Sequence, residues 1–338
     1  MNLSYFPRNQ YSPSKTPIEK AERLTAMLGG PDIFIKRDDL LGLTEGGNKT
    51  RKLEFLIAEA QAKGADTIIT AGGIQSNHCR LTLAACVKEG LKCVLILEEN
   101  EKAQYDTQTN GNFLLYQLLG TEALHIVPNG TDVYEEMEKT AEVMRREGRK
   151  PYVIPVGGSN VTGITGYAAC AEEIHGQAEA EGLSFDYVVC TSGSGGMHAG
   201  LIAGFKGLGA RTEVIGINVS RGKAEQEENV YKLVQETADH IGVKQEIPRG
   251  AVTCFDDYVG LGYALPTNGM IEAVKTAART EALLLDPVYT GKTMDGLIDL
   301  IRKGFFKKGD SVLFIHSGGT PAVYAYSPVF YTEDYKGD

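Results

Sequence analysis

Short apolar runs alternate with helical patterns along almost the whole chain. The strand-like runs cover residues 32–37, 67–71, 93–97, 125–128, 152–155, 186–191, 213–219 and 311–316. Helical patterns lie between them at 49–63, 77–89, 133–147, 163–180, 197–208, 224–241, 269–280 and 291–304. Because strands that alternate with helices form parallel sheets with helices on both faces, we expect an α/β protein with open, twisted, mostly parallel sheets.

The length of the chain and its glycine turns predict two domains. A chain of 338 residues exceeds what one hydrophobic core usually supports. Glycine turns before Lys49 and at Gly157 bracket a block of strand–helix units. We therefore expect a smaller domain of residues 48–159 and a larger domain of residues 1–47 and 160–338. Because ligands of open α/β sheets collect at the carboxyl ends of strands, a cleft between two such sheets is the expected site.

Composition excludes several classes of protein. The net charge is −10, and no cluster of lysine and arginine interleaved with aromatic residues is present, so nucleic-acid binding is not expected. The chain shows no apolar region of a signal peptide in residues 1–17 and no later run of membrane-spanning length, which predicts a cytoplasmic protein without membrane contacts. The six cysteines form no Cys-x-x-Cys pair, so we expect buried thiols and no metal site.

Lys49 follows a glycine turn and opens an amphipathic helix, in the string Gly-Gly-Asn-Lys-Thr-Arg-Lys-Leu-Glu. The positive end of a helix disfavours an ammonium group and so lowers its pKa. A lysine amine that is unprotonated at neutral pH can form a Schiff base. The alternative is an ordinary first-turn lysine.

A second glycine-rich loop, 191–200, follows the strand-like run 186–191 and opens another helix. Its small side chains leave backbone amides exposed at a helix N-terminus, which is an arrangement suited to a phosphate. A dinucleotide fingerprint does not fit, because its third glycine falls at His198 and the next strand ends in Asn-Val-Ser at 218–220, without an acid for a ribose. A purely structural turn is the alternative.

Three further loops combine polar residues with turns. Ser76 and Asn77 stand before a helix, where they fit an N-cap and could also bind a substrate carboxylate. Tyr289 stands just before another helix, where a phenol could stack on or hydrogen-bond near an aromatic ligand. The third loop, His-Ser-Gly-Gly-Thr-Pro-Ala at 316–322, follows the last strand-like run.

Taken together and in order, these motifs resemble the D-cysteine desulfhydrase and 1-aminocyclopropane-1-carboxylate deaminase family. The matching strings run from Phe6 to about Tyr326 and include Gln-Ser-Asn-His and Asp-Pro-Val-Tyr-Thr-Gly-Lys. The resemblance implies a fold type II enzyme that uses pyridoxal 5'-phosphate (PLP), acts on a small amino acid and forms a homodimer.

The resemblance also implies roles for individual residues. Lys49 would hold the cofactor covalently, and Asn77 would hydrogen-bond its ring hydroxyl. Family members often have threonine where this chain has Met197, so here only the backbone amide could contact the phosphate. The full set of implied cofactor contacts is Lys49, Lys52, Asn77, Ser194, Gly195, Gly196, Met197, Thr290 and Ser317. The implied catalytic residues are Lys49, Ser76 and Tyr289, and the implied substrate contacts are Ser76, Asn77, His78 and Tyr289.

Position 290 distinguishes the activities within this family. Deaminases that open a cyclopropane ring resemble Asp-Pro-Val-Tyr-Glu here, whereas this chain has Thr290, which supplies no charge to the pyridine nitrogen. The expected reaction is therefore α,β-elimination of D-cysteine to pyruvate, ammonia and hydrogen sulfide. An L-cysteate sulfo-lyase is the alternative, with Arg80, His78 or Arg221 as the group that would receive a sulfonate. A less favoured deaminase, and a non-catalytic sensor of a phosphorylated metabolite, are further alternatives.

Overall fold

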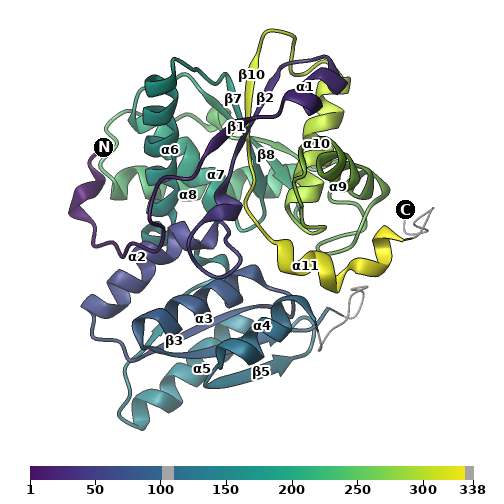
Figure 1. Cartoon of the computed structure of the whole chain (residues 1–338). Helices are drawn as coiled ribbons and strands as arrows, with labels where there is room; N and C mark the ends of the chain where they lie inside the picture. Colours follow the sequence, from purple (N-terminus) through teal and green to yellow (C-terminus); the bar gives the residue numbers. More distant parts are fainter. Residues whose placement is uncertain (101–109, 332–338) are drawn as a thin grey trace.

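The computed structural model describes residues 1–100 and 110–331 and shows two sheets (Figure 1). The larger sheet has six strands in the order β1-β2-β10-β7-β8-β9, and the smaller sheet has four in the order β5-β4-β3-β6. Every neighbouring pair is parallel except β1 with β2. The expected α/β class with two open, mostly parallel sheets is confirmed.

The strands within the described residues are β1 Ile18–Lys20, β2 Asp32–Lys36, β3 Thr67–Gly73, β4 Lys92–Glu98, β5 Ala123–Val127, β6 Pro151–Val153, β7 Tyr187–Ser192, β8 Glu213–Asn218, β9 Thr253–Phe255 and β10 Ser311–Ile315. The helices there are α1 Glu22–Leu28, α2 Lys49–Ala62, α3 Asn77–Glu89, α4 Gly111–Leu119, α5 Val133–Arg146, α6 Val161–Glu181, α7 Gly196–Gly207, α8 Lys223–His240, α9 Asn268–Glu281, α10 Thr290–Arg302 and α11 Thr320–Ala325. All sixteen predicted elements are present within a few residues of their expected ends. The prediction missed β1, β9, α1, α4 and α11, which are too short to show a clear periodicity.

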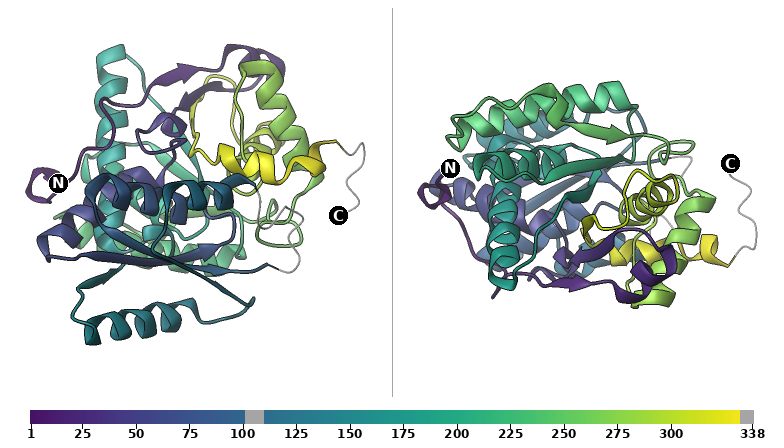
Figure 2. Two further views of the ribbon diagram at one scale, coloured as in Figure 1. Left: turned by 60° about the horizontal axis from the view of Figure 1, so that its bottom comes forward. Right: turned by 90° about the horizontal axis from the view of Figure 1, so that it is seen from above.

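Helices cover both faces of the larger sheet, as Figure 2 shows. On β2, Ile33 and Ile35 pack in the core beneath α9 and α10, whereas Phe34 between them packs beneath α6, α7 and α8. The strand period of two therefore sends alternate apolar residues into two separate cores. This explains why the strands are continuous apolar runs in the sequence.

The smaller sheet is covered in the same way. Ile68 and Leu95 pack against α2 and α3 on one face, and Ile69 and Val94 pack against α5 on the other. Its four strands all lie within residues 48–159. The division of the chain into domains at these two boundaries stays a prediction.

Glycines bring α2, α6 and α7 into close contact. A Cβ atom at Gly166 of α6 would overlap the backbone carbonyl of Arg51 in α2. A Cβ atom at Gly200 of α7 would lie 2.6 Å from the Cβ of Tyr167 in α6. Because α2 begins at Lys49 and α7 follows the glycine-rich loop, this packing sets the two candidate site segments relative to each other.

A buried ion cluster fixes α2 from the other side. The Arg51 guanidinium contacts Asp38 at 2.7 Å and Glu173 of α6 at 2.9 Å. Glu173 also contacts Lys36 of β2 at 2.6 Å. The cluster joins β2, the segment after it, α2 and α6, so the start of α2 is anchored to the larger sheet.

Two findings concern membranes and metals. In residues 1–100 and 110–331, no helix has the length and apolarity needed to cross a membrane. The same residues contain no group of three or more His, Cys, Asp or Glu side chains that could hold a metal ion. All six cysteines are buried free thiols, as expected.

Replacing Gly166 with alanine is expected to destabilise the protein, because the new methyl group meets backbone atoms of α2 that cannot move aside. We expect a loss of about 1–3 kcal/mol in the free energy of unfolding, measured by denaturant titration. Gly176→Ala in the same helix is the matched control, since a Cβ there meets nothing within 4 Å and should gain about 0.5–1 kcal/mol. Equal effects of the two substitutions would show that the α2–α6 contact is not tight.

Candidate active site

The turn before Lys49 is built from backbone packed on backbone. Gly46 and Gly47 have positive φ angles of 60° and 123°, which favour glycine. A Cβ at Gly46 would overlap the carbonyl of Asp39, and a Cβ at Gly318 would lie 2.7 Å from the Cα of Gly47. The Asn48 N–H also donates to the Ser317 carbonyl at 3.0 Å. The turn thus fits the end of β10 only because neither side carries a side chain.

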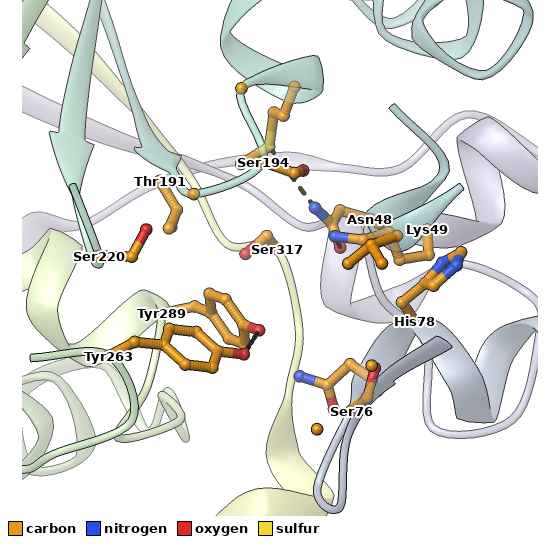
Figure 3. Close-up of a pocket in the computed structure, with 18 of the residues that line it drawn as sticks. Asn48, Lys49, Ser76, His78, Thr191, Ser194, Ser220, Tyr263, Tyr289 and Ser317 are labelled. Carbon is orange, nitrogen blue, oxygen red and sulfur yellow. Dashed lines mark hydrogen bonds between the residues drawn. The ribbon is translucent and has the colours of Figure 1, made fainter. Parts of the chain in front are cut away.

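Lys49 projects from this turn into a cavity of about 420 Å³ (Figure 3). Its Nζ donates to Asn48 Oδ1 at 3.3 Å. Burial lowers the pKa of Lys49 to about 8, and the Asp286 carboxylate opposes this shift. Loss of water on burial thus acts in the same direction as the helix N-terminus that the sequence analysis invoked.

The glycine-rich loop places the N-terminus of α7 at the same cavity. Gly195 is left-handed with φ 87°, and a Cβ on Gly196 would lie 2.6 Å from Lys52 Nζ. Lys52 Nζ donates to the Gly157 carbonyl at 2.9 Å and to Ser159 Oγ at 2.8 Å. Ser159 Oγ in turn donates to Ser194 Oγ at 2.8 Å. An amine, two hydroxyls and a helix N-terminus therefore converge on one point.

The charge at that point suits a phosphate. Lys52 is buried, and it makes no ion pair with an Asp or Glu among the described residues. Burial first, and then the charge of Lys49, hold the pKa of Lys52 well below its usual range. A dianion such as a phosphate would supply the missing negative charge and accept hydrogen bonds from the helix N-terminus. The residues present therefore fit the phosphate of PLP.

Met197 contacts the turn before Lys49. The Asn48 side-chain amide lies 4.0 Å from the Met197 sulfur, within the range of a weak hydrogen bond, while its oxygen accepts from Lys49. Met197 thus lies against the amide that accepts from the Lys49 amine, and it offers no hydroxyl to a phosphate.

Ser76 and Asn77 lie at the start of α3 and line the cavity. Ser76 Oγ accepts from the Cys79 N–H at 3.1 Å, so the N-cap prediction is confirmed. The Asn77 Oδ1 accepts from Asn112 Nδ2 at 2.8 Å. The Asn77 side-chain N–H groups have no acceptor among the described residues and are thus left as donors to a ligand.

His78 is buried and neutral. The Thr70 hydroxyl donates to the Ile154 carbonyl at 2.8 Å, so it must accept from His78 Nε2, which lies 2.8 Å away. Burial and the charges of Lys49 and Lys52 hold the pKa of His78 well below its usual range. An imidazole in this state brings no positive charge to a sulfonate.

Tyr289 and Tyr263 line the cavity across from Lys49 (Figure 3). Their hydroxyls hydrogen-bond to each other, and their ring centroids lie 6.0 Å apart. Burial raises the pKa of both phenols. The sequence analysis did not single out Tyr263, although its place in the glycine-rich string Gly-Leu-Gly-Tyr resembles the other loops of the site.

Most of the predicted site residues meet at this one cavity. Those that line it are Lys49, Lys52, Ser76, Asn77, His78, Ser194, Gly195, Met197, Tyr289 and Ser317. Gly196 begins α7 between the lining residues Gly195 and Met197 but is not itself part of the lining. Thr290 also lies outside it, because it is fully buried and its hydroxyl donates to Asp286 Oδ1 at 2.7 Å.

The two arginines that the sequence offered for a sulfonate have other partners. Arg80 is buried outside the cavity lining, where it donates to Asn112 Oδ1 at 2.7 Å. Arg221 lines the cavity, but its guanidinium donates to the Gly193 carbonyl at 3.0 Å and contacts Glu225 at 3.1 Å. Arg221 therefore supports the glycine-rich loop.

Fold and site together define an enzyme class. Residues 10–318 match the family model described as pyridoxal-phosphate dependent enzyme, so the chain belongs to that family and PLP is its cofactor. A solved structure described as an ACC deaminase homologue is 38% identical to this chain, with a TM-score of 0.88, and the match covers 97% of this chain and 96% of the other. The predicted resemblance is thereby confirmed at the level of fold type II PLP enzymes.

Lys49 is expected to react with acylating reagents at lower pH than an exposed lysine, because burial favours its neutral amine. In the cofactor-free protein, acetic anhydride labelling followed by mass spectrometry should give a half-maximal rate near pH 8. Lys139 is the control, since Glu135 and Glu136 raise its pKa above the usual value. Identical pH profiles for the two lysines would contradict the burial of the Lys49 amine.

Proposed function

We propose that this protein catalyses PLP-dependent α,β-elimination of a cysteine-like amino acid, with D-cysteine as the substrate. The products are pyruvate, ammonia and hydrogen sulfide. The observation that carries the proposal is the composition of the cavity. Among the described residues, the cavity offers the Lys49 amine and the phenols of Tyr263 and Tyr289 for proton transfer. Of the other cations in its lining, Lys52 lies at the proposed phosphate site and Arg221 already donates to the Gly193 carbonyl.

Lys49 would hold PLP covalently, and Lys52, Ser194, Gly195 and the start of α7 would hold its phosphate. When bound, PLP supplies an electron sink that acidifies the α-hydrogen of an amino acid. Ser76 would bind the substrate carboxylate and Asn77 would hydrogen-bond the ring hydroxyl oxygen of PLP, because both line the cavity at the start of α3. Ser317 lines the cavity and would be available to the pyridine ring, whereas Thr290 is buried outside the lining.

Proton transfer falls to groups on two sides of the cavity. The Lys49 amine, with its pKa lowered to about 8, can accept the α-proton on one side. The Tyr263–Tyr289 pair can give or take a proton on the other side. Loss of the α-proton and departure of the β-sulfur with its bonding electrons leave an enamine, and its reaction with water yields pyruvate and ammonia.

The charge of the leaving group separates D-cysteine from L-cysteate. A sulfonate requires an additional cation or several free donors. His78 is neutral, Arg80 lies outside the cavity lining, and Arg221 is engaged with Gly193 and Glu225. The thiol of D-cysteine needs no such partner, which favours the desulfhydrase over the sulfo-lyase.

An ACC deaminase is the second candidate, because the similar solved structure is described as a homologue of that enzyme. Residue 290 argues against it, since this chain has threonine there. Glu98 is the only Asp or Glu among the described residues that line the cavity, and its Oε1 accepts from the Gly130 N–H at 2.8 Å. No carboxylate is thus offered to the pyridine nitrogen from the lining.

A parallel assay of D-cysteine, L-cysteine, L-cysteate and 1-aminocyclopropane-1-carboxylate tests the proposal. We expect sulfide and pyruvate in equal amounts from D-cysteine, and little sulfite from L-cysteate. Lys49→Ala should abolish turnover and also the visible absorption that borohydride bleaches in the wild-type protein. A colourless wild-type protein after addition of PLP would support the sensor alternative, whereas turnover of the cyclopropane substrate alone would identify a deaminase.

Removing either phenol should slow catalysis without unfolding the protein. We expect Tyr289→Phe and Tyr263→Phe to lower kcat on D-cysteine by roughly 10²-fold, the usual contribution of a positioned proton-transfer group. Tyr258→Phe is the matched control, because its hydroxyl donates to Asp299 at 2.7 Å outside the cavity lining. If all three variants keep wild-type kcat, the tyrosine pair has no part in proton transfer.

A further inference from the structure

Arg80 is a buried guanidinium without an acidic partner. Its side chain is inaccessible to solvent, and it makes no ion pair with Asp or Glu in the described part of the chain. Burial lowers the pKa of Arg80 to about 10, and Tyr116 and Glu45 oppose that shift. A buried charge of this kind is costly and needs full hydrogen bonding.

The donors of Arg80 join two parts of the site. One part is the turn before Lys49, where the guanidinium donates to the Thr44 carbonyl and to the Gly46 carbonyl at 3.2 Å. The other part is Asn112 at the start of α4, whose Oδ1 accepts from Arg80 Nε at 2.7 Å. Arg80 therefore contacts the Lys49 turn and, through Asn112, the start of α3.

This contact determines the orientation of two amides in series. A guanidinium can only donate, so Asn112 must turn its oxygen to Arg80 and its NH₂ group to Asn77. Asn112 Nδ2 then donates to Asn77 Oδ1 at 2.8 Å and to the Gln75 carbonyl at 2.9 Å. Asn77 must in turn direct its own NH₂ group away from Asn112. Since Asn77 lines the cavity, that group is available to a ligand.

We propose that Arg80 is a positioning residue of the active site: acting through Asn112, it holds the Asn77 amide as a hydrogen-bond donor toward an anionic oxygen of the bound cofactor. The inference rests on the proposed binding of PLP at Lys49. The hydrogen bonds from Arg80 to Asn112 and from Asn112 to Asn77 form a relay. Without this relay, the Asn77 amide can turn over and present its oxygen, which repels an anionic oxygen. Arg80 thus acts on the cofactor electronically without touching it.

Asn112→Asp is the variant that separates this role from mere support of the fold. A carboxylate at residue 112 still accepts from Arg80 and adds an ion pair to it, which offsets the lost hydrogen bond to the Gln75 carbonyl, so the cofactor-free protein should still fold. It cannot donate to Asn77, however, so the relay is reversed. We expect the Kd for PLP to rise roughly tenfold, as for loss of one hydrogen bond at a charged oxygen.

The pKa of the cofactor-linked Lys49 nitrogen is the spectroscopic readout. A donor on the neighbouring cofactor oxygen draws negative charge away from that nitrogen and so lowers its pKa. In Asn112→Asp the pH midpoint of the visible band should therefore rise, by about 0.5–1 unit. Arg80→Met should raise it likewise, and Arg80→Lys, which keeps a cationic donor, should raise it less.

Two controls complete the experiment. Acetic anhydride labelling of Lys49 in the cofactor-free variants should keep the wild-type pH midpoint, because the relay acts only on a bound oxygen. Arg51→Lys alters another buried arginine, one paired with Asp38 and Glu173, and should lower the melting temperature without moving the visible midpoint.

Unchanged pH midpoints of the visible band in Asn112→Asp and Arg80→Met would overturn the proposal. It would also be overturned if the labelling midpoint of cofactor-free Lys49 shifted as much as the visible midpoint, because the change in charge alone would then explain both shifts. If Arg80→Met does not fold, Asn112→Asp decides the question. A wild-type protein that shows no visible band with PLP would instead refute the proposed function.

Discussion

The contact between the Gly46–Gly47 turn and the end of β10 is the constraint on which the site depends. It places two backbone segments, far apart in sequence, closer together than any side chain would allow. Lys49 lies two residues after Gly47, and the same contact brings Ser317 into the cavity. Because the glycine packing of α2, α6 and α7 sets the phosphate loop against the same helix, the reactive amine and the phosphate site are positioned by backbone contacts rather than by flexible side chains.

The site is also an accumulation of positive charge with few acids near it. Lys52 and Arg80 are buried without an ion pair among the described residues, and Lys49 lies close enough to lower the pKa of Lys52. Such an arrangement destabilises the empty site, since like charges repel and burial removes their hydration. An anionic cofactor relieves both costs, so its binding stabilises the folded protein as well as supplying the chemistry.

The sequence predicted the elements and most of the cavity because both depend on local patterns. Apolar runs revealed the strands, and glycine turns after strands marked the loops around Lys49, Ser194 and Ser317. Tyr263, Ser159 and Asn112 were missed, since their roles arise from contacts across long stretches of chain: Asn112 meets Arg80 across 32 positions, and Ser159 meets Lys52 across 107. The same limit applies to Arg80 and Thr290, whose local strings suggested ligand contacts while the fold gives them protein partners.

The surroundings of Asp286 show how position 290 can matter without entering the cavity. Asp286 is buried at the start of α10, where its carboxylate accepts from the backbone N–H groups of Val288, Tyr289 and Thr290 and from the Thr290 hydroxyl. These donors favour the ionised form against the effect of burial. An ionised Asp286 in turn attracts the proton of Lys49 and limits how far burial lowers the pKa of that amine. A carboxylate at position 290 would remove one of these donors and add a second negative charge beside the first. In this structure Thr290 therefore belongs to the hydrogen-bond network of Asp286 at the start of α10 and not to the cavity lining.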